Sequence, residues 1–532
     1  ETVTVDLTAL AGRTVWLAWR GVSNCTYENE GWYIDQVTVQ ATMPACPASA
    51  DPEDVQYLTA RATSGQVKLE WLNPAGGGYG ATKVCRDTAG YPDPASCTPI
   101  ASQPGTLGAY DSFTDTGLAN GTTYYYTAFV DDGSGTLSGG RHVTARPFDT
   151  TGKVRWAYSS GATSLAPTGV MPGAIGTGGT WAVSNDRVLH AMNPTGSGGD
   201  WPRTGDFSWT PLAMNGPAQA RPPIVPTSVI SGHSMVTFLG SEDGRAYAAD
   251  AHTGQLLWQS PELGSIVLAS PAGIFTGFGG AYDLLFIGSR DATSDNRMYM
   301  LDPSDGHIIA TFDNGGGAGG MGIISTSATV DYATNRIYFA SRERAGGSSD
   351  TLWCLSFDGS GFAKVWSRPY GDIDGAAILY GGRIYVGDNA GTVHAVDPSD
   401  GSEIWSYATG DGPVKSFVMP EFTASTPRKL YFSTTNAVWA LTDNGASASL
   451  AWQQTNIAGP STPLVPIGDT RLYVGSTDGK LYQLDTASGA IQTSVVLGDG
   501  TATIGSPALD VVNNMAYAGS ESGAVYGVQL PL

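Results

Sequence analysis

One stretch constrains the fold more than any other, because variants of it recur from about residue 180 to the C-terminal residue. Residues 383–407, RIYVGDNAGTVHAVDPSDGSEIWSY, contain short runs of β-branched and aromatic residues at 384–387, 392–396 and 403–407. The turns DNAG and DPSDG separate these runs, because Asp, Asn, Ser and Gly tolerate left-handed backbone angles or hydrogen-bond their own backbone. One such unit cannot bury its apolar face alone, so the sequence predicts a series of repeated β-sheet units.

An aromatic or histidine residue marks the third strand of each repeat, and a Gly-containing turn follows it. The marks are His190, Tyr247, Tyr299, Trp353, His394, Trp439, Tyr482 and Tyr526. In several repeats a Trp lies in the next strand, at Trp258, Trp366, Trp405 and Trp452. The eight marks predict an eight-bladed β-propeller over residues 153–532.

The two ends of the repeat region are complementary. The last repeat stops at AVYGVQLPL and lacks a fourth strand, whereas an isolated strand pattern, KVRWAY, precedes the first repeat. Pairing the first strand with the last blade closes a propeller ring and removes its free sheet edges. We therefore expect the final blade, near Tyr526, to receive its fourth strand from Val154, Arg155, Trp156, Ala157 and Tyr158.

The pattern V-G-S-x-D-G-x-L-Y-x-L-D-x-x-[ST]-G occurs at residues 474–489 and in a variant at 240–258. It resembles the PQQ-like propeller repeat, which quinoprotein alcohol dehydrogenases share with an outer-membrane-assembly scaffold lipoprotein. By that resemblance, a quinone dehydrogenase carries adjacent cysteines over the cofactor ring, a Trp beneath it, and a Glu, Asn and Asp set for Ca²⁺. The sequence contains no Cys-Cys pair, and its Trp residues fall mainly at repeat positions that pack between blades. The resemblance therefore implies the fold rather than the quinone.

Residues 54–147 form a different unit, with KLEWLNP, a Cys-containing loop and LANGTTYYYTAFVDD. This order resembles a fibronectin type III domain. The resemblance implies that Trp71 anchors the core from an early strand and that Leu118 and Tyr124 form a tyrosine corner. It also implies that the domain acts as a spacer or presenter and that these residues are structural.

Residues 1–44 contain three strand patterns, with LAGRTVWLAW and the signature GWYID at 31–35. They resemble the last strands of MAM-like or choice-of-anchor jelly-roll modules, and residues 45–53 read as a Pro-rich linker. The sequence starts directly with a strand pattern and without a signal peptide, so we expect a mature or trimmed product. A partial sandwich has unpaired strand edges. Either the precursor was cut or truncated, or strands of a neighbouring copy complete the sheet.

The composition limits the partners. A formal net charge of −21 and the lack of a Lys/Arg cluster argue against nucleic acid. No apolar run is long enough to cross a membrane as a helix. We therefore expect other protein chains as partners, including copies of the same chain that pair through the incomplete N-terminal sandwich.

The five cysteines suggest an oxidising compartment. Cys25 with Cys46 and Cys85 with Cys97 are candidate disulfides because each pair brackets a loop. Cys354 is left over, and it falls at an inward-facing strand position of a repeat, so we expect a buried, inert thiol.

Other polar groups indicate no catalytic residue. His190 and His394 replace the repeat tyrosine and are expected to be strand residues with satisfied rings. A GxGxxG match at residues 315–320 precedes a strand pattern instead of the helix that phosphate binding needs, and so predicts a connecting loop. Acidic turns could bind Ca²⁺, although Asp usually stabilises such turns through local hydrogen bonds. These turns contain Asp291, Asp295, Asp302, Asp305, Asp372, Asp374, Asp397 and Asp400.

Together, the modular order and the acidic composition predict a non-catalytic, bacterial, extracellular or cell-surface protein. Its expected role is protein–protein interaction or assembly, for example as a subunit of a surface appendage or filament. Two alternatives stay open: a quinone-dependent redox enzyme that uses the propeller channel, and a glycan-binding adhesin.

Overall fold

The computed structural model describes residues 52–149, 151–161, 169–171, 179–183, 187–192, 212–219, 221–226, 228–264, 267, 269, 271–291, 295–414, 416–422 and 427–532. All of these residues belong to one unit, Asp51–Leu532. The expected jelly-roll segment at residues 1–44, with Cys25 and Cys46, lies outside the described residues, as does nearly all of the linker at 45–53.

The described part of the chain is all-β. Its elements are antiparallel strands and two short 3-10 helices, η3 (Thr276–Phe278) and η4 (Gly317–Gly319). The second 3-10 helix lies within the GxGxxG match, and β21 (Thr329–Asp331) is the next strand. The expected connecting loop therefore occupies this position.

Residues 54–147 form two antiparallel sheets, called here the two-sheet region. One sheet contains β1 (Gln56–Thr63), β2 (Gln66–Leu72) and β5 (Tyr110–Thr116). The other has the order β4 (Pro99–Gln103), β3 (Ala81–Asp87), β6 (Tyr124–Asp131) and β7 (Arg141–Ala145).

The core of the two-sheet region is built around aromatic residues that alternate along the strands. Trp71 of β2 is fully buried, and its indole Nε1 donates a hydrogen bond to Asn73 Oδ1 over 2.9 Å. The Tyr124 hydroxyl accepts a hydrogen bond from the backbone N–H of Ala119 over 3.0 Å, while Leu118 is buried beside it in the same cluster. The indole and the hydroxyl thus satisfy polar groups that burial would otherwise leave unpaired.

From residue 169 onward the chain forms small antiparallel sheets, in each of which consecutive strands are neighbours. The first three consist of β9 (Gly169–Met171), β10 (Gly179–Val183), β11 (Val188–Met192) and β12 (Leu212–Ala213); β13 (Ile224–Val225), β14 (Val236–Gly240), β15 (Ala246–Asp250) and β16 (Leu256–Gln259); and β17 (Ala272–Ile274), β18 (Leu284–Gly288), β19 (Met298–Leu301) and β20 (Ile308–Phe312).

The next four sheets follow the same order. They consist of β21, β22 (Arg336–Ala340), β23 (Leu352–Phe357) and β24 (Phe362–Arg368); β25 (Ile378–Tyr380), β26 (Arg383–Gly387), β27 (Thr392–Val396) and β28 (Glu403–Ala408); β29 (Met419–Pro420), β30 (Arg428–Ser433), β31 (Val438–Asp443) and β32 (Ala448–Gln454); and β33 (Arg471–Gly475), β34 (Lys480–Asp485) and β35 (Ile491–Val496).

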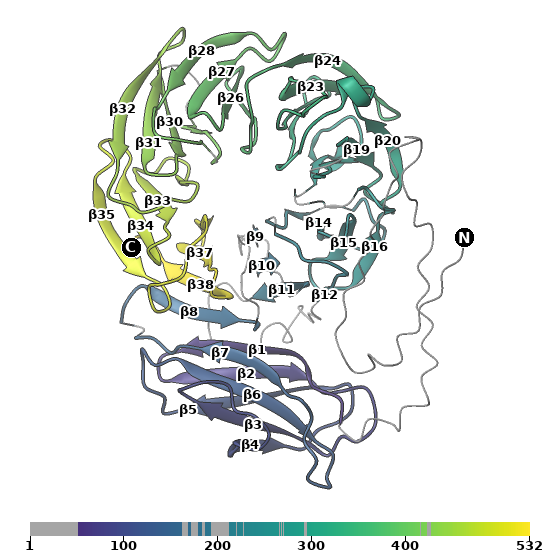
Figure 1. Cartoon of the computed structure of the whole chain (residues 1–532), viewed down its shortest axis with the longest axis vertical. Coiled ribbons are helices and arrows are strands. Elements are labelled where there is room, and N and C mark those ends of the chain that lie inside the picture. The colour runs from purple at the N-terminus through teal and green to yellow at the C-terminus, as the bar shows by residue number, and fades with distance from the viewer. Residues whose placement is uncertain are drawn as a thin grey trace, which may run out of the picture. The chain divides into compact units, whose positions relative to one another are not determined.

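The last sheet combines strands from both ends of the unit. Its order is β36 (Ala508–Asp510), β37 (Met515–Gly519), β38 (Ala524–Gln529), β8 (Val154–Ser159), β1, β2 and β5. Figure 1 shows β8 between β38 and the two-sheet region. The sheet formed by β1, β2 and β5 is thus continuous with the last sheet of the repeat.

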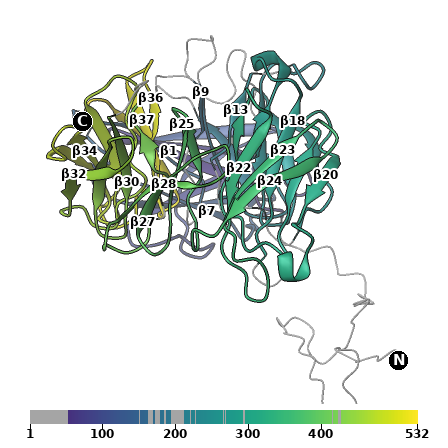
Figure 2. The same ribbon diagram turned by 90° about the horizontal axis from the view of Figure 1, so that it is seen from above.

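The sheets lie around a common centre, with β20, β24, β28, β32 and β35 on the outside (Figure 1). The first strand β9 contacts β13 of the following sheet and β36 of the last sheet, and these strands also lie near one another in the turned view of Figure 2. The two ends of the repeat region therefore meet.

Repeated turns explain why the sheets pack closely. In the turn after β27, Asp397 Oδ1 accepts hydrogen bonds from the Ser399 backbone and hydroxyl, and Gly401 adopts a φ of +75°. The Trp366 ring of the preceding sheet covers this glycine, so a Cβ at Gly401 would lie 2.5 Å from a ring carbon. Only glycine satisfies both the backbone angle and the close approach.

Candidate functional site

The strand β8 is shared between the repeat region and the two-sheet region. On one side Tyr158, Ala157 and Trp156 pair with Val525, Tyr526 and Gly527 of β38, and Val154 pairs with Val528. On the other side Ser159, Tyr158 and Ala157 pair with Ala60, Arg61 and Ala62 of β1. The structure thus brings residues 154–158 beside Tyr526, where the sequence suggested a closing strand. The second pairing, with β1, was not expected from the sequence.

Trp156 takes the place that a Trp occupies in other fourth strands. It is fully buried and stacks on Tyr517 of the second strand, with ring centroids 5.7 Å apart. Equivalent pairs of a second-strand and a fourth-strand aromatic residue are Phe238 with Trp258, Tyr338 with Trp366, Tyr385 with Trp405, and Tyr431 with Trp452. The strand β8 therefore supplies the aromatic residue that the last repeat itself lacks.

Arg61 of β1 links the two regions electrostatically. Its guanidinium lies 5.2 Å from the centroid of the Trp156 ring, which is a cation–π contact. Burial of the guanidinium lowers the pKa of Arg61 to about 10. A charged group is costly to bury unless its surroundings compensate, so the indole face and the nearby Glu70 stabilise this arrangement.

A single hydrophobic cluster spans the junction. It includes Trp71 and Tyr126 of the two-sheet region and Leu481, Tyr526 and Val528 of the last sheets. Burial of apolar surface on both sides of β8 makes separation of the two regions unfavourable. The two-sheet region and the repeat region therefore share a hydrophobic core as well as a sheet.

An open cleft of about 300 Å³ lies beside the junction. It is lined by Tyr91 and Thr144 of the two-sheet region and by Ser159, Glu521 and Ser522. The cleft therefore combines an aromatic ring, hydroxyl groups and a carboxylate.

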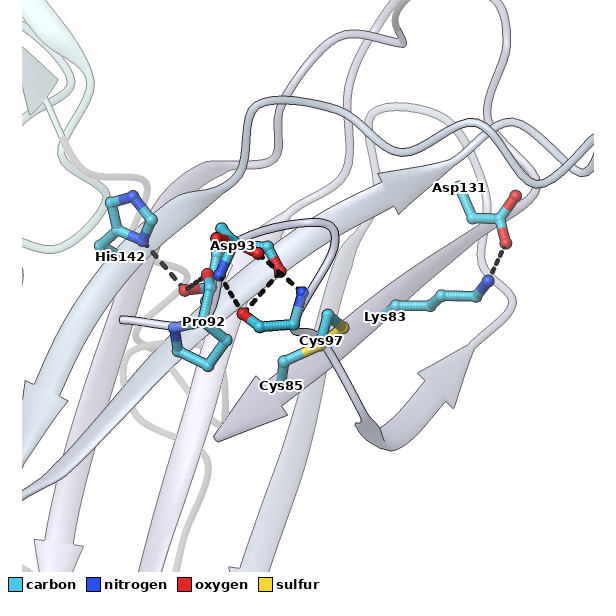
Figure 3. Close-up of a disulfide and its surroundings, with 9 residues drawn as sticks. Lys83, Cys85, Pro92, Asp93, Cys97, Asp131 and His142 are labelled. Carbon is cyan, nitrogen blue, oxygen red and sulfur yellow. Dashed lines mark hydrogen bonds and ion pairs between the residues drawn. A yellow bond between two sulfur atoms is a disulfide. The ribbon is translucent and has the colours of Figure 1, made fainter. Parts of the chain in front are cut away.

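A disulfide holds the loop that carries Tyr91. Cys85 and Cys97 are bonded, and Figure 3 shows this bond at the base of the loop. The Thr127 hydroxyl donates a hydrogen bond to the Pro92 carbonyl over 2.8 Å and so ties the loop to β6. The Tyr91 ring lies 4.7 Å from that of His142, yet 45% of the residue stays exposed. The Cys pair was visible in the sequence, but the position of Tyr91 over a cleft was not.

Neighbouring side chains stiffen the same loop. Asp93 Oδ1 accepts a hydrogen bond from the backbone N–H of Ser96 over 2.7 Å, and this bond together with the Ser96 hydroxyl lowers the pKa of the Asp93 carboxyl. Lys83 forms an ion pair with Asp131 on the adjacent strands (Figure 3). The loop is thus held at its base and within its turn.

Cys354 and two of the histidines are internal to the sheets. Cys354 is fully buried in β23, and burial raises the pKa of its thiol to about 12. The two ring nitrogens of His394 lie 2.7 Å from Glu403 Oε2 and 3.3 Å from Asp388 Oδ2. The Nδ1 atom of His190 lies 3.0 Å from the Tyr158 hydroxyl. Both rings thus have partners within the protein.

Most of the acidic turn residues are engaged locally. Asp374 makes a bidentate ion pair with Arg342 at 2.7 and 2.9 Å, and Asp295 is paired with Arg344. Asp400 Oδ1 accepts a hydrogen bond from the Ser402 backbone. These contacts correspond to the turn-stabilising role that Asp commonly has.

One acidic turn has a possible metal-ligand arrangement. Ligand atoms of Asp302, Asp305 and His307 lie within 4.8 Å of one another. Asp302 Oδ1 already accepts bonds from the Ser304 backbone and hydroxyl, and Asp305 accepts from the His307 backbone. The group is largely exposed, and no second feature in the described residues marks it as a site.

The fourth-strand tryptophans act between sheets. The indole Nε1 of Trp258 donates to the Pro303 carbonyl of the next sheet over 2.9 Å, and Trp452 donates to the Thr486 carbonyl over 3.0 Å. Trp405 differs, because it donates to the buried carboxylate of Asp443 over 3.0 Å. All three rings are therefore used in packing between neighbouring sheets.

Repeated four-stranded sheets around a common centre, joined by Trp-on-Gly contacts, define a β-propeller built from PQQ-like repeats. The sequence at residues 141–407 and 242–495 matches the family described as "Outer membrane protein assembly factor BamB". Because these matches together span more than half of the chain, the protein belongs to this family.

Two solved structures are similar to the chain. One is BamB from Moraxella catarrhalis, with 18% sequence identity and a TM-score of 0.48, covering 68% of this chain and 96% of that one. The other is the computationally designed Ika8 protein, with 12% identity and a TM-score of 0.49, covering 69% of this chain and 96% of that one. No curated protein matches the chain. Within the described residues, no helix is long and apolar enough to span a membrane.

Proposed function

We propose that the protein is a non-catalytic platform for protein–protein interaction or assembly at the bacterial cell surface. In this proposal residues 153–532 form an eight-bladed propeller closed by residues 154–158. Residues 54–147 form a fibronectin type III-like domain, and residues 45–53 link it to a partial jelly-roll sandwich at residues 1–44. Membership in a family named for assembly of outer membrane proteins supports a role with protein partners.

The observation that carries this proposal is the shared strand β8. Because β1 extends the last propeller sheet and one hydrophobic cluster spans the junction, the two regions hold their surfaces in a fixed relation. A rigid arrangement lowers the entropic cost of binding a partner that contacts both regions. This is the property that an assembly platform requires.

One version of the proposal is a subunit of a surface appendage, in which strands of one copy complete the N-terminal sandwich of the next. The test is electron microscopy of material from the native cell surface, together with sedimentation of the purified full chain. Ordered filaments or stoichiometric complexes with other chains would support the platform. Dispersed monomers with a self-contained N-terminal domain would remove the appendage version, and monomers without any bound chain in native material would contradict the platform itself.

The cleft at the junction favours a second candidate, glycan binding. Aromatic rings stack on sugar faces, and carboxylates and hydroxyls hydrogen-bond sugar hydroxyls, so Tyr91, Glu521 and Ser522 provide the needed chemistry. A glycan array with the wild-type chain and the Tyr91→Ala variant tests this candidate. Hits that disappear in the variant would support it, and an array without hits would reject it.

A further inference from the structure

The turns between the first and second strands of the repeat share one face. In each four-stranded sheet the strands follow one another in the same order, and the first strands of several neighbouring sheets contact each other, as in β9 with β13, β17 with β21 and β21 with β25. Sheets that repeat around a common centre run in the same sense, so equivalent turns lie at the same end of the ring. Any pattern in these turns is therefore a pattern on one face of the propeller.

Three consecutive turns of this kind expose large apolar side chains. Ile467 lies between Leu464, which forms a bridge to Tyr473 in place of a first strand, and β33, and it is 78% exposed. Val511 and Val512 lie between β36 and β37 and are 60% and 49% exposed. Phe422 lies between β29 and β30 and is 48% exposed. We call these four residues the apolar rim.

Contacts between the sheets place the parts of the apolar rim on adjacent units. The Ser433 hydroxyl donates to the Ser461 carbonyl over 2.7 Å, which joins the sheets that carry Phe422 and Ile467. The backbone N–H of Thr462 donates to the Ser506 hydroxyl over 3.0 Å, which joins the latter sheet to the last one. The rim therefore follows an arc over three neighbouring sheets.

A matched turn shows that the fold does not require Val511 and Val512, whereas the Phe422 ring packs edge-on against Tyr380 with ring centroids 5.5 Å apart. The turns at residues 331–335 and 510–514 share an opening Asp and a closing Asn with a φ of +51° or +52°. In each, the Asp side chain accepts a hydrogen bond from the backbone two residues later, at 3.0 Å to Ala333 and 3.1 Å to Val512.

The two turns differ in what they expose. Tyr332 of the first turn folds back, and its hydroxyl donates to the Gly273 carbonyl over 3.0 Å, with the small Ala333 next to it. The second turn carries two valines at these positions, although turns usually favour polar residues. Exposed apolar clusters of this kind often mark interaction sites.

The charge of the chain indicates what kind of protein could bind the apolar rim. The chain carries 48 Asp and Glu residues against 27 Lys and Arg, so two copies repel each other. Exposed Glu421 stands directly beside Phe422 of the apolar rim. We propose that the apolar rim docks a different protein chain whose aliphatic side chains are flanked by basic residues. This inference rests on the proposed interaction function and assigns it a surface.

The test uses the purified full chain and fluorescent model peptides of alternating Lys and Val, with Lys/Ser and Glu/Val peptides of equal length as probes of charge and apolarity alone. The variant Phe422→Ser, Ile467→Ser, Val511→Ser, Val512→Ser removes the rim. The matched control is Tyr332→Ser, Ala333→Ser in the equivalent turn. Because the four rim side chains are exposed, the rim variant should keep the circular dichroism spectrum of the wild type.

Fluorescence anisotropy should show binding of the Lys/Val peptide to the wild type and the control variant, and binding about tenfold weaker to the rim variant. The inference is overturned if the rim variant binds as tightly as the wild type, if the Lys/Ser peptide binds equally well, or if the wild type does not bind. It is also overturned if sedimentation shows self-association that the rim variant abolishes. These outcomes test the apolar rim only. The proposed interaction function is tested separately, by whether native material contains other chains bound to the protein.

Discussion

Replacement of Trp156 by alanine tests whether β8 closes the propeller and joins it to the two-sheet region. The side chain is fully buried, stacks on Tyr517 and lies under the Arg61 guanidinium. Truncation of a buried Trp to Ala typically costs about 3–5 kcal/mol. The lost cation–π contact contributes about 1 kcal/mol of this amount, because it is partly desolvated. We therefore expect a decrease of about 4–5 kcal/mol in the free energy of unfolding.

The matched control is Trp452→Ala. Trp452 has the same place in its sheet, is buried and packs at a tilt against Tyr431 with ring centroids 6.0 Å apart. It lies away from the junction, and among the described residues no guanidinium lies over its ring. Its loss should cost about 3–4 kcal/mol. Urea denaturation followed by circular dichroism measures both values, and Arg61→Met alone and combined with Trp156→Ala should reveal a coupling of about 1 kcal/mol.

Hydrogen exchange separates a local effect from a failure of closure. Trp156→Ala should accelerate amide exchange in β1, β8 and β38, because these strands form one hydrogen-bonded sheet. Trp452→Ala should instead affect β30, β31 and β32. Unchanged protection of β1 and β38 in Trp156→Ala would refute the view that this residue fastens the shared strand.

Three further predictions follow from particular groups. Burial raises the pKa of the Cys354 thiol to about 12 from an unfolded value of 9.0, so the contribution of this thiol to the free energy of unfolding should be complete below pH 9 and decline as the pH rises toward 12. Peptide mapping after alkylation should find Cys354 unmodified in the native protein at pH 8. Reduction of Cys85–Cys97, which closes a loop of sequence separation 12, should destabilise the two-sheet region by about 3 kcal/mol, and a denaturation midpoint unaffected by dithiothreitol would contradict this. Asp443→Ala should cost about 4 kcal/mol because it leaves the buried Trp405 indole and a tyrosine hydroxyl unpaired, with thermal unfolding as the measurement.

Much of the repeat could be predicted from the sequence because its signals are local. The strands β26 (Arg383–Gly387), β27 (Thr392–Val396) and β28 (Glu403–Ala408) differ from the expected runs by a single residue at two ends. The marking residues all lie in the strands before the outermost ones, since side chains alternate along a strand and turn residues restrict the backbone at each end. The PQQ-like repeat was identified for the same reason.

The candidate site was less accessible to sequence reasoning. The disulfide between Cys85 and Cys97 follows from the short loop between them, but the placement of Tyr91 against Glu521 depends on segments about 430 residues apart in the chain. The apolar rim could have been noticed in the sequence as valines within an Asp-to-Asn turn. Its exposure could not, because the equivalent Tyr332 folds onto a neighbouring sheet.

The sequence by itself determined the repeated strand and turn units, because these depend on the chemistry of side chains close together in the chain. Only the tertiary structure decided that β1 lies against the free edge of β8 and that one hydrophobic cluster spans both regions. Strand edges pair through backbone N–H and C=O groups, which every residue except proline carries, so such pairing leaves no distinctive side-chain pattern in the sequence.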